Sequence, residues 1–361
     1  MLKSLFRARG SATAEPEIDP TEGRSTEELI EELESLKRRN QEHPDADTEV
    51  KLVELRHAVG IRRLDEAQAG AAYPEPTFDR LPDRNGDLAG IGPAELSPEV
   101  LRAGILRDGC LLIRGALDRD TALSLAEGID RAFQAREKAQ ANFSRERVDD
   151  PWGPRENADR MYYSEFTPTP RFRKALSRDW IQTGGGLWIA DSPHLLFEML
   201  GAFDRAGLGA AIRGYLGEPP LMTVQKCTLR KVDPDAGRGW HQDGAFMGDV
   251  RALNVWLSLS HCGDDEAPGM DVVPRRLDGI LASGQEGTDF DWSISEQVAE
   301  EAAGETGIVR PVFEPGDMLL FDDLFLHTTA AEPSMRNSRM AIESWFFGAS
   351  AAPEQYSPLA A

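Results

Sequence analysis

The sequence is poor in the residues that cross-link a small secreted protein or carry a chain through a membrane. Its 361 residues include three cysteines, Cys110, Cys227 and Cys262, none of them in CxxC spacing. An odd number of scattered cysteines argues against a disulfide framework, so we expect a reducing, cytoplasmic location. No run of about 18 apolar residues is present, and we therefore expect no transmembrane helix.

Basic residues are scarce relative to acidic ones. Lys and Arg number 40, against 62 Asp and Glu, which gives a formal net charge of −22. Phosphate backbones and anionic lipids bind positively charged surfaces. We therefore expect neither a nucleic acid nor a membrane as partner. The sequence leaves the oligomeric state open.

Composition divides the chain into one large domain and shorter flanking segments. Ser25 and Glu28 have the spacing of a capping box before a helical pattern. Prolines and glycines are frequent between residues 70 and 96. The predicted segments are a disordered tail (1–24), a helical hairpin (25–69), a linker (70–96), one large domain that contains the predicted strands (97–350) and a C-terminal tail (351–361).

The hydrophobic period changes from 3.6 to 2 after about residue 217. Strand-like runs separated by turn residues cover 221–232, 252–260, 270–273, 318–321 and 339–347. Short strands at close spacing, without helices between them, are typical of an antiparallel sandwich or barrel. The predicted fold class is therefore α+β, mainly antiparallel β, with flanking helices and an N-terminal helical extension.

Two histidines lie near carboxylates in strand-like context. In Trp240-His241-Gln242-Asp243, strand alternation places His241 and Asp243 on one face. His327 closes the apolar segment that begins at 318. Two histidines and one carboxylate can form the facial triad that leaves positions open on Fe(II). We predict that His241, Asp243 and His327 bind a metal.

An arginine, Arg339, follows the second histidine, His327, by 12 residues. Arg339 opens the run 339–347, and an arginine that enters a barrel interior needs an anion. A dicarboxylate that chelates iron at one end would place its other carboxylate there, and Thr329 offers a hydroxyl donor. Arg336 is a rival candidate, but it lies among turn residues.

Taken together, His241-Gln242-Asp243, His327 with Thr329, and Arg339 resemble the phytanoyl-CoA dioxygenase family of Fe(II)/2-oxoglutarate oxygenases. The resemblance covers about residues 97–347. It implies a double-stranded β-helix (jelly-roll, cupin-like) core with iron on the three ligands, and 2-oxoglutarate held by Arg339 and Thr329. It also implies Trp256 and Gln225 beside the cosubstrate, with Lys226 facing away.

The resemblance implies a dioxygenase that uses O2 and 2-oxoglutarate to hydroxylate a small molecule, releasing succinate and CO2. Related halogenases lack the carboxylate ligand, so Asp243 favours hydroxylation. One departure concerns substrate: many members have a G-x-L-x-x-x-P-G-S-H stretch, whereas this chain ends it with Pro274-Arg275-Arg276. The substrate, and whether a carrier holds it, cannot be read from the sequence.

Two other classes of function stay open at this point. The same ligands could hold zinc in a jelly-roll hydrolase or isomerase, although such an enzyme has no need of Arg339 and Thr329. A non-catalytic protein could instead bind partners through its N-terminal helices. Three local readings complete the expectations: an aromatic-rich substrate mouth in 142–190, a turn or hinge at 184–186, and a surface strand end at His261.

Overall fold

The computed structural model describes residues 23–361, except 69, 85–86, 147–158, 176–177, 238, 285–287 and 289–290. The expected disordered tail therefore lies outside the described residues, apart from 23 and 24. Trp152, one of the aromatics assigned to a substrate mouth, also lies outside them. No helix in the described part of the chain is long and apolar enough to cross a membrane.

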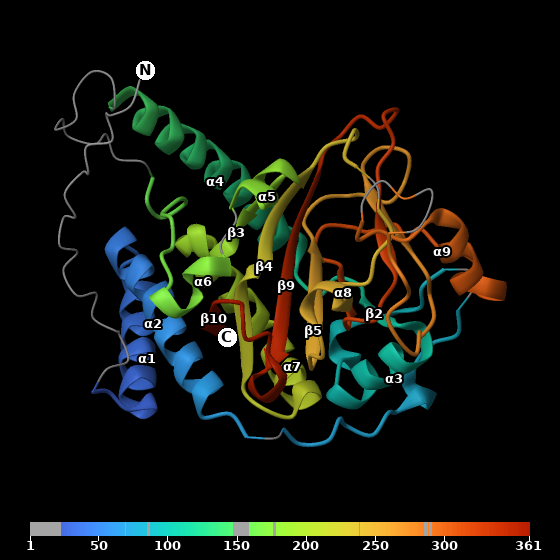
Figure 1. Ribbon diagram of the computed structural model, residues 1–361, viewed down its shortest axis with the longest axis horizontal. Helices are drawn as coiled ribbons and strands as arrows, with labels where there is room; N and C mark the ends of the chain where they lie inside the picture. Colours follow the sequence, from blue (N-terminus) through green and yellow to red (C-terminus); the bar gives the residue numbers. More distant parts are fainter. Residues whose placement is uncertain are drawn as a thin grey trace, which may run out of the picture.

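Two sheets form the core (Figure 1). The larger has the strand order β1-β2-β7-β5-β9-β4-β10, with β3 beside β4, and the smaller pairs β6 with β8. Apart from the parallel β1–β2 pair, the strand pairings are antiparallel. This confirms the expected α+β fold with a mainly antiparallel jelly-roll core. The strands are β1 (Gly90–Ile91), β2 (Cys110–Ile113), β3 (Gly186–Trp188), β4 (Pro220–Val232), β5 (Ala252–Ser258), β6 (Gly269–Val272), β7 (Met318–Phe321), β8 (His327–Ala330), β9 (Arg339–Gly348) and β10 (Pro358–Ala360).

Most of the helices pack on one face of the large sheet, and the small sheet lies on the other, together with the two short helices at 244–247 and 296–303. Alternation along β5 separates the two cores: Leu253, Val255 and Leu257 pack with the helices, whereas Trp256 packs with residues of the small sheet. The helices are α1 (Thr26–Glu42), α2 (Ala46–Asp65), α3 (Pro98–Asp108), α4 (Arg119–Glu146), α5 (Arg178–Thr183), α6 (Pro193–Arg205), α7 (Leu208–Leu216), α8 (Gly244–Met247) and α9 (Glu296–Ala303).

The N-terminal helix pair lies against the C-terminal end of the chain. Helices α1 and α2 share a small apolar cluster that includes Ala360. Arg56 donates to the Ala360 carbonyl at 2.8 Å, and a ring nitrogen of His57 lies 2.8 Å from the Pro358 carbonyl. Residues 358–360 pair with β4 and complete the sheet edge. The expectation of a tail at 351–361 is thus corrected, because backbone pairing and α2 hold its last residues in the fold.

Three of the aromatic residues in the described part of 142–190 lie in the core and not at the expected substrate mouth, whereas Trp180 is exposed. Tyr162, Tyr163 and Trp188 are buried in the helix-side core, on the face of the sheet opposite the small sheet. Gly184 and Gly185 form the expected turn, but Gly186 begins β3 and pairs with Arg230 of β4. Apolar burial, rather than substrate access, therefore explains these aromatic side chains.

Candidate metal centre

The backbone holds the two histidines of the predicted triad against each other. His241 and His327 exchange backbone hydrogen bonds of 3.0 and 3.1 Å in an isolated antiparallel bridge. Their rings lie 4.4 Å apart between centroids. Nδ1 of His241 lies 2.8 Å from the Gly239 carbonyl, and Nδ1 of His327 lies 3.2 Å from the Phe325 carbonyl. A carbonyl only accepts, so each Nδ1 carries the proton and each Nε2 keeps a lone pair for a metal.

Asp243 joins the histidines from a different kind of backbone. Strand alternation was the reason to place Asp243 on the same face as His241, but Asp243 has helical dihedral angles and precedes α8. Gln242 points away between the two ligands, and its side chain bonds the backbone of Gly279, Leu281 and Leu324. One ligand atom from each of His241, Asp243 and His327 lies within 4.8 Å of the others. The structure thus brings together all three predicted ligands.

The donor atoms suit a divalent cation. Oδ2 of Asp243 is buried and has no hydrogen-bond partner among the described residues, while it lies 3.8 Å from Nε2 of His327. Burial, followed by the proximity of His241, lowers the pKa of His327 to about 4, so its lone pair is free at neutral pH. Burial would raise the pKa of Asp243, but Lys226 and the two histidines hold it well below its usual value. Two imidazoles and one carboxylate match the ligand set of a non-haem iron centre.

Lys226, and not Gln225, faces the centre. Nζ of Lys226 lies 2.9 Å from Oδ1 of Asp243. The Gln225 side chain bonds Ser357 instead, through its Nε2 and its Oε1. The pairing of β4 with β9 is irregular between Met222 and Cys227, where β4 advances five residues and β9 only two, and this irregularity reverses the alternation of side chains. The expected positions of Gln225 and Lys226 are therefore corrected.

Arg339 and Trp256 lie together on the small-sheet side of the core. Arg339 is 4% exposed, and its guanidinium carbon lies 5.4 Å from the centroid of the Trp256 ring. Nη1 donates to the Gly269 carbonyl at 2.7 Å, whereas buried Nε has no partner among the described residues. Burial lowers the pKa of this guanidinium. Such a cation suits the carboxylate of a ligand.

Thr329 lies next to this arginine in the small sheet. It pairs with Met270, the neighbour of the Gly269 that accepts from Arg339. Thr329 is half-buried and shares a strand face with His327, two residues earlier. Strand β8, which carries both residues, was not among the predicted strands. It has four residues and no apolar run, so periodicity gave no signal for it.

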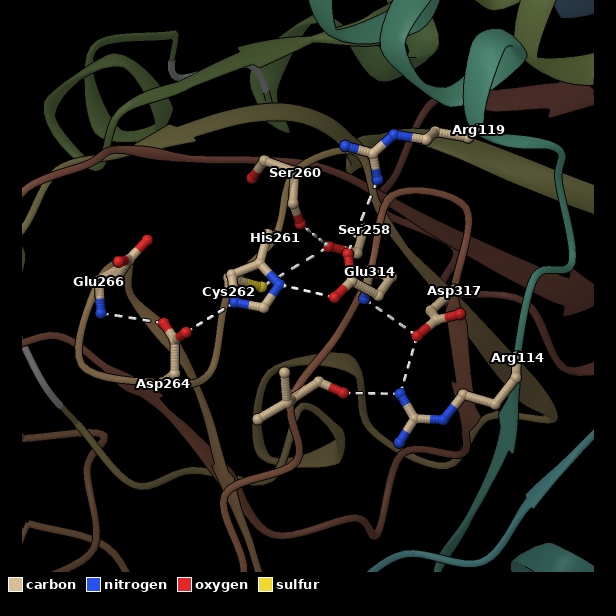
Figure 2. Close-up of polar contacts among 11 residues, drawn as sticks. Arg114, Arg119, Ser258, Ser260, His261, Cys262, Asp264, Glu266, Glu314 and Asp317 are labelled. Carbon is tan, nitrogen blue, oxygen red and sulfur yellow. Dashed lines mark hydrogen bonds and ion pairs between the residues drawn. The ribbon is translucent and has the colours of Figure 1, made fainter.

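His261 belongs to a separate surface cluster, shown in Figure 2. Its Nε2 lies 2.6 Å from Asp264 and its Nδ1 lies 2.9 Å from Glu314. The hydrogen bond with Asp264, followed by that with Glu314, raises the pKa of His261. The two carboxylates are on opposite edges of the ring, so they cannot share one ion with it. In the described ranges, the triad is the one group of three potential ligands that could hold a metal.

The arginines that replace the family's G-S-H have different surroundings. Arg276 forms an ion pair with Asp322, which is buried, while Arg275 is exposed. The departure from the family pattern thus includes an internal ion pair.

Two aromatic rings that the sequence did not single out lie near His241. Trp292 lies 5.5 Å and Phe246 6.3 Å from its ring, between centroids.

The His-Asp-His cluster and the buried Arg339 lie in a mainly antiparallel jelly roll. The family model for phytanoyl-CoA dioxygenase (PhyH) matches residues 105–341. The chain belongs to this family, which confirms the resemblance seen in the sequence and supports iron with 2-oxoglutarate as its cofactors.

Solved structures with similar folds are distant in sequence. EctD from S. alaskensis with 2-oxoglutarate and 5-hydroxyectoine is 16% identical, with a TM-score of 0.44 over 78% of this chain and 85% of that one. AviO1 from Streptomyces viridochromogenes Tue57 is 17% identical, with a TM-score of 0.38 over 70% of this chain and 96% of that one. No curated protein has a significantly matching sequence. The family assignment rests on the match over residues 105–341.

Proposed function

We propose that the protein is a non-haem Fe(II)/2-oxoglutarate-dependent dioxygenase that hydroxylates an unactivated C–H bond of a small molecule. The observation that carries this proposal is the pairing of two complementary sites. His241, Asp243 and His327 present an anionic, nitrogen-containing ligand set, and Arg339 presents a buried cation whose Nε has no partner in the described part of the protein. A metal and a dicarboxylate would satisfy both.

Each residue has a distinct part in this reaction. Iron with 2-oxoglutarate supplies the oxidation, in which O2 gives one atom to succinate and one to the product's hydroxyl group, with release of CO2. His241 and His327 bind through Nε2 because backbone carbonyls hold the opposite nitrogens. Arg339 and Thr329 hold the distal carboxylate of the cosubstrate, and the Trp256 ring covers the guanidinium. The carboxylate of Asp243 takes the position that a halide needs in halogenases, which favours hydroxylation.

An anaerobic titration tests the cosubstrate site directly. Metal-free protein receives Fe(II) and then 2-oxoglutarate, and the metal-to-ligand charge-transfer band is recorded. We expect a band in the wild type, none in His241→Ala, and a much higher requirement for 2-oxoglutarate in Arg339→Ala. His261→Ala and Arg275→Ala are matched controls, because these residues lie outside the site, and both variants should behave like the wild type.

The outcomes separate the classes of function left open by the sequence. A folded, iron-loaded wild type without a band would overturn the cosubstrate assignment and direct attention to zinc and hydrolysis. A band in every variant would show that the metal binds elsewhere. If the band forms as expected, succinate release in the presence of candidate compounds becomes the substrate screen.

A further inference from the structure

Lys226 places a buried ammonium group on one oxygen of a proposed metal ligand. Its side chain is 14% exposed, and its Nζ contacts Oδ1 of Asp243. The other oxygen, Oδ2, has no hydrogen-bond partner among the described residues and points towards His327. The two oxygens of one carboxylate therefore have different surroundings before any metal binds.

The irregular stretch of β4 explains how a lysine reaches this position. Met222, Val224, Cys227 and Leu229 all belong to the helix-side core. The spacing between Val224 and Cys227 is therefore three residues instead of two, within the irregular stretch of β4, and Lys226 shares the opposite face with Thr228 and Arg230. Bulges re-aim side chains near active sites in this way.

Asp243 is the carboxylate that pairs with Lys226, because the other nearby groups are engaged elsewhere or uncharged. Glu343, the other nearby carboxylate, already forms an ion pair with Arg230 at 3.1 Å. The ring of Phe246 lies 5.3 Å from Nζ and covers the ammonium group on another side. Removing Lys226 would leave Oδ1 of Asp243 without this partner inside the protein.

We propose that Lys226 is a positioning residue that engages Oδ1 of Asp243 and so restricts the metal to Oδ2. This inference rests on the proposed function, because its consequence concerns the number of open metal positions. Two histidines and a monodentate carboxylate leave three of six positions for cosubstrate and O2. A carboxylate that chelated through both oxygens would occupy one of those three.

Co(II) is a suitable probe, because its visible spectrum reports the number of ligands and it needs neither O2 nor 2-oxoglutarate. Metal-free wild type, Lys226→Met and Lys226→Arg are titrated with Co(II), and affinity and spectrum are recorded. Lys231→Met is the matched control: Lys231 is on the same strand but pairs with exposed Asp130. We expect Lys226→Met to change the Co(II) affinity by about 10- to 100-fold and to alter the spectrum, because both oxygens of Asp243 can then reach the metal. Lys226→Arg should stay close to the wild-type affinity and spectrum, and Lys231→Met should match the wild type.

Two results would overturn the proposal. One is wild-type affinity and spectrum in folded Lys226→Met. The other is an equal change in the Met and Arg variants, which would show that the lysine acts through packing rather than charge. If Lys226→Met does not fold, Lys226→Arg decides alone, because a changed spectrum in that folded variant contradicts charge-based positioning. A wild type that binds Co(II) but forms no charge-transfer band with Fe(II) and 2-oxoglutarate would refute the proposed function. The comparison of the Lys226 variants with Co(II) would still test the role of Lys226, because it needs no 2-oxoglutarate.

Discussion

Replacing Arg339 with methionine should separate ligand binding from stability. The guanidinium makes one hydrogen bond to the described protein, to the Gly269 carbonyl, and its Nε makes none. Losing that bond costs about 0.5–1.5 kcal/mol. An apolar side chain of similar length also removes a buried charge that lacks a carboxylate partner, which offsets the loss. We therefore expect the free energy of unfolding to stay within about 1.5 kcal/mol of the wild-type value.

The affinity for 2-oxoglutarate should respond very differently. Truncating one partner of a buried, hydrogen-bonded charge pair costs about 2–5 kcal/mol, which is roughly a 30- to 5000-fold loss of affinity. Anaerobic titration of the iron-loaded variant measures this loss, and urea denaturation without ligand measures stability. The combination of weak binding and preserved stability is specific to a residue retained for its ligand.

Arg310 provides the contrasting case. It holds Asp271, which is 5% exposed, through two hydrogen bonds of 2.7 and 3.0 Å. Arg310→Met leaves that carboxylate without its arginine and should lower the free energy of unfolding by about 3 kcal/mol. The reasoning fails if Arg339→Met binds 2-oxoglutarate normally, or if it is destabilised as strongly as Arg310→Met.

Three further predictions concern the rest of the fold. In Gly60→Ala the new Cβ would lie 2.9 Å from the carbonyl carbon of Pro358, so the free energy of unfolding, measured by urea denaturation, should fall by about 1–3 kcal/mol. Gly279→Ala is the control: it has open space around it and should leave the free energy of unfolding unchanged. The pKa of His261 is raised in the folded protein, so this residue contributes its full stabilisation below the ordinary histidine pKa near 6.5 and loses it as the pH rises through the pKa of the folded state. The denaturation midpoint of the wild type should fall over this pH range, and that of His261→Gln should not. The three cysteines are buried, and burial raises their pKa values. An aromatic disulfide reagent should therefore label none of them in the native protein and all three in guanidinium. Rapid labelling of the native protein would contradict the described core.

The sequence predicted the clustering of His241, Asp243 and His327 because its signals are local. His241 and Asp243 are separated by one residue, so any backbone that turns them to one side brings them together. His327 follows an apolar strand, and the antiparallel pairing of short strands is sufficient to bring it to the first pair. Strand alternation does not hold at Asp243, which has helical dihedral angles, yet the two side chains still lie together, because the chain turns into α8 directly after Asp243.

Other parts of the fold had no readable pattern. Strand β8 is polar, and β10 has three residues whose pairing depends on distant β4. The aromatics of 142–190 were assigned to a substrate mouth because the segment lacks periodicity. The structure buries Tyr162 and Tyr163 in the helix-side core, and composition alone cannot distinguish those two environments.

The error at Gln225 and Lys226 has a more specific cause. Strand periodicity carries information only while the register is regular, and a bulge reverses every inward and outward assignment after it. Nothing in the run Val224-Gln225-Lys226-Cys227 marks a bulge, since each residue is compatible with a strand. Only pairing with Ser344 of β9 shows that the register has shifted.

Two unpartnered charged atoms of the interior fit the ligands proposed for the metal centre. Lys226 is a buried cation, but Asp243 matches it within the chain. What remains on the metal side is one anionic atom, Oδ2 of Asp243, and one cationic group, the Nε edge of Arg339, each buried without a hydrogen-bond partner in the described residues. Burying either atom unsatisfied costs free energy, so the fold tolerates them because ligands complete them. A divalent metal satisfies the first and a carboxylate the second, and a dicarboxylate that chelates the metal joins the two sites in one ligand.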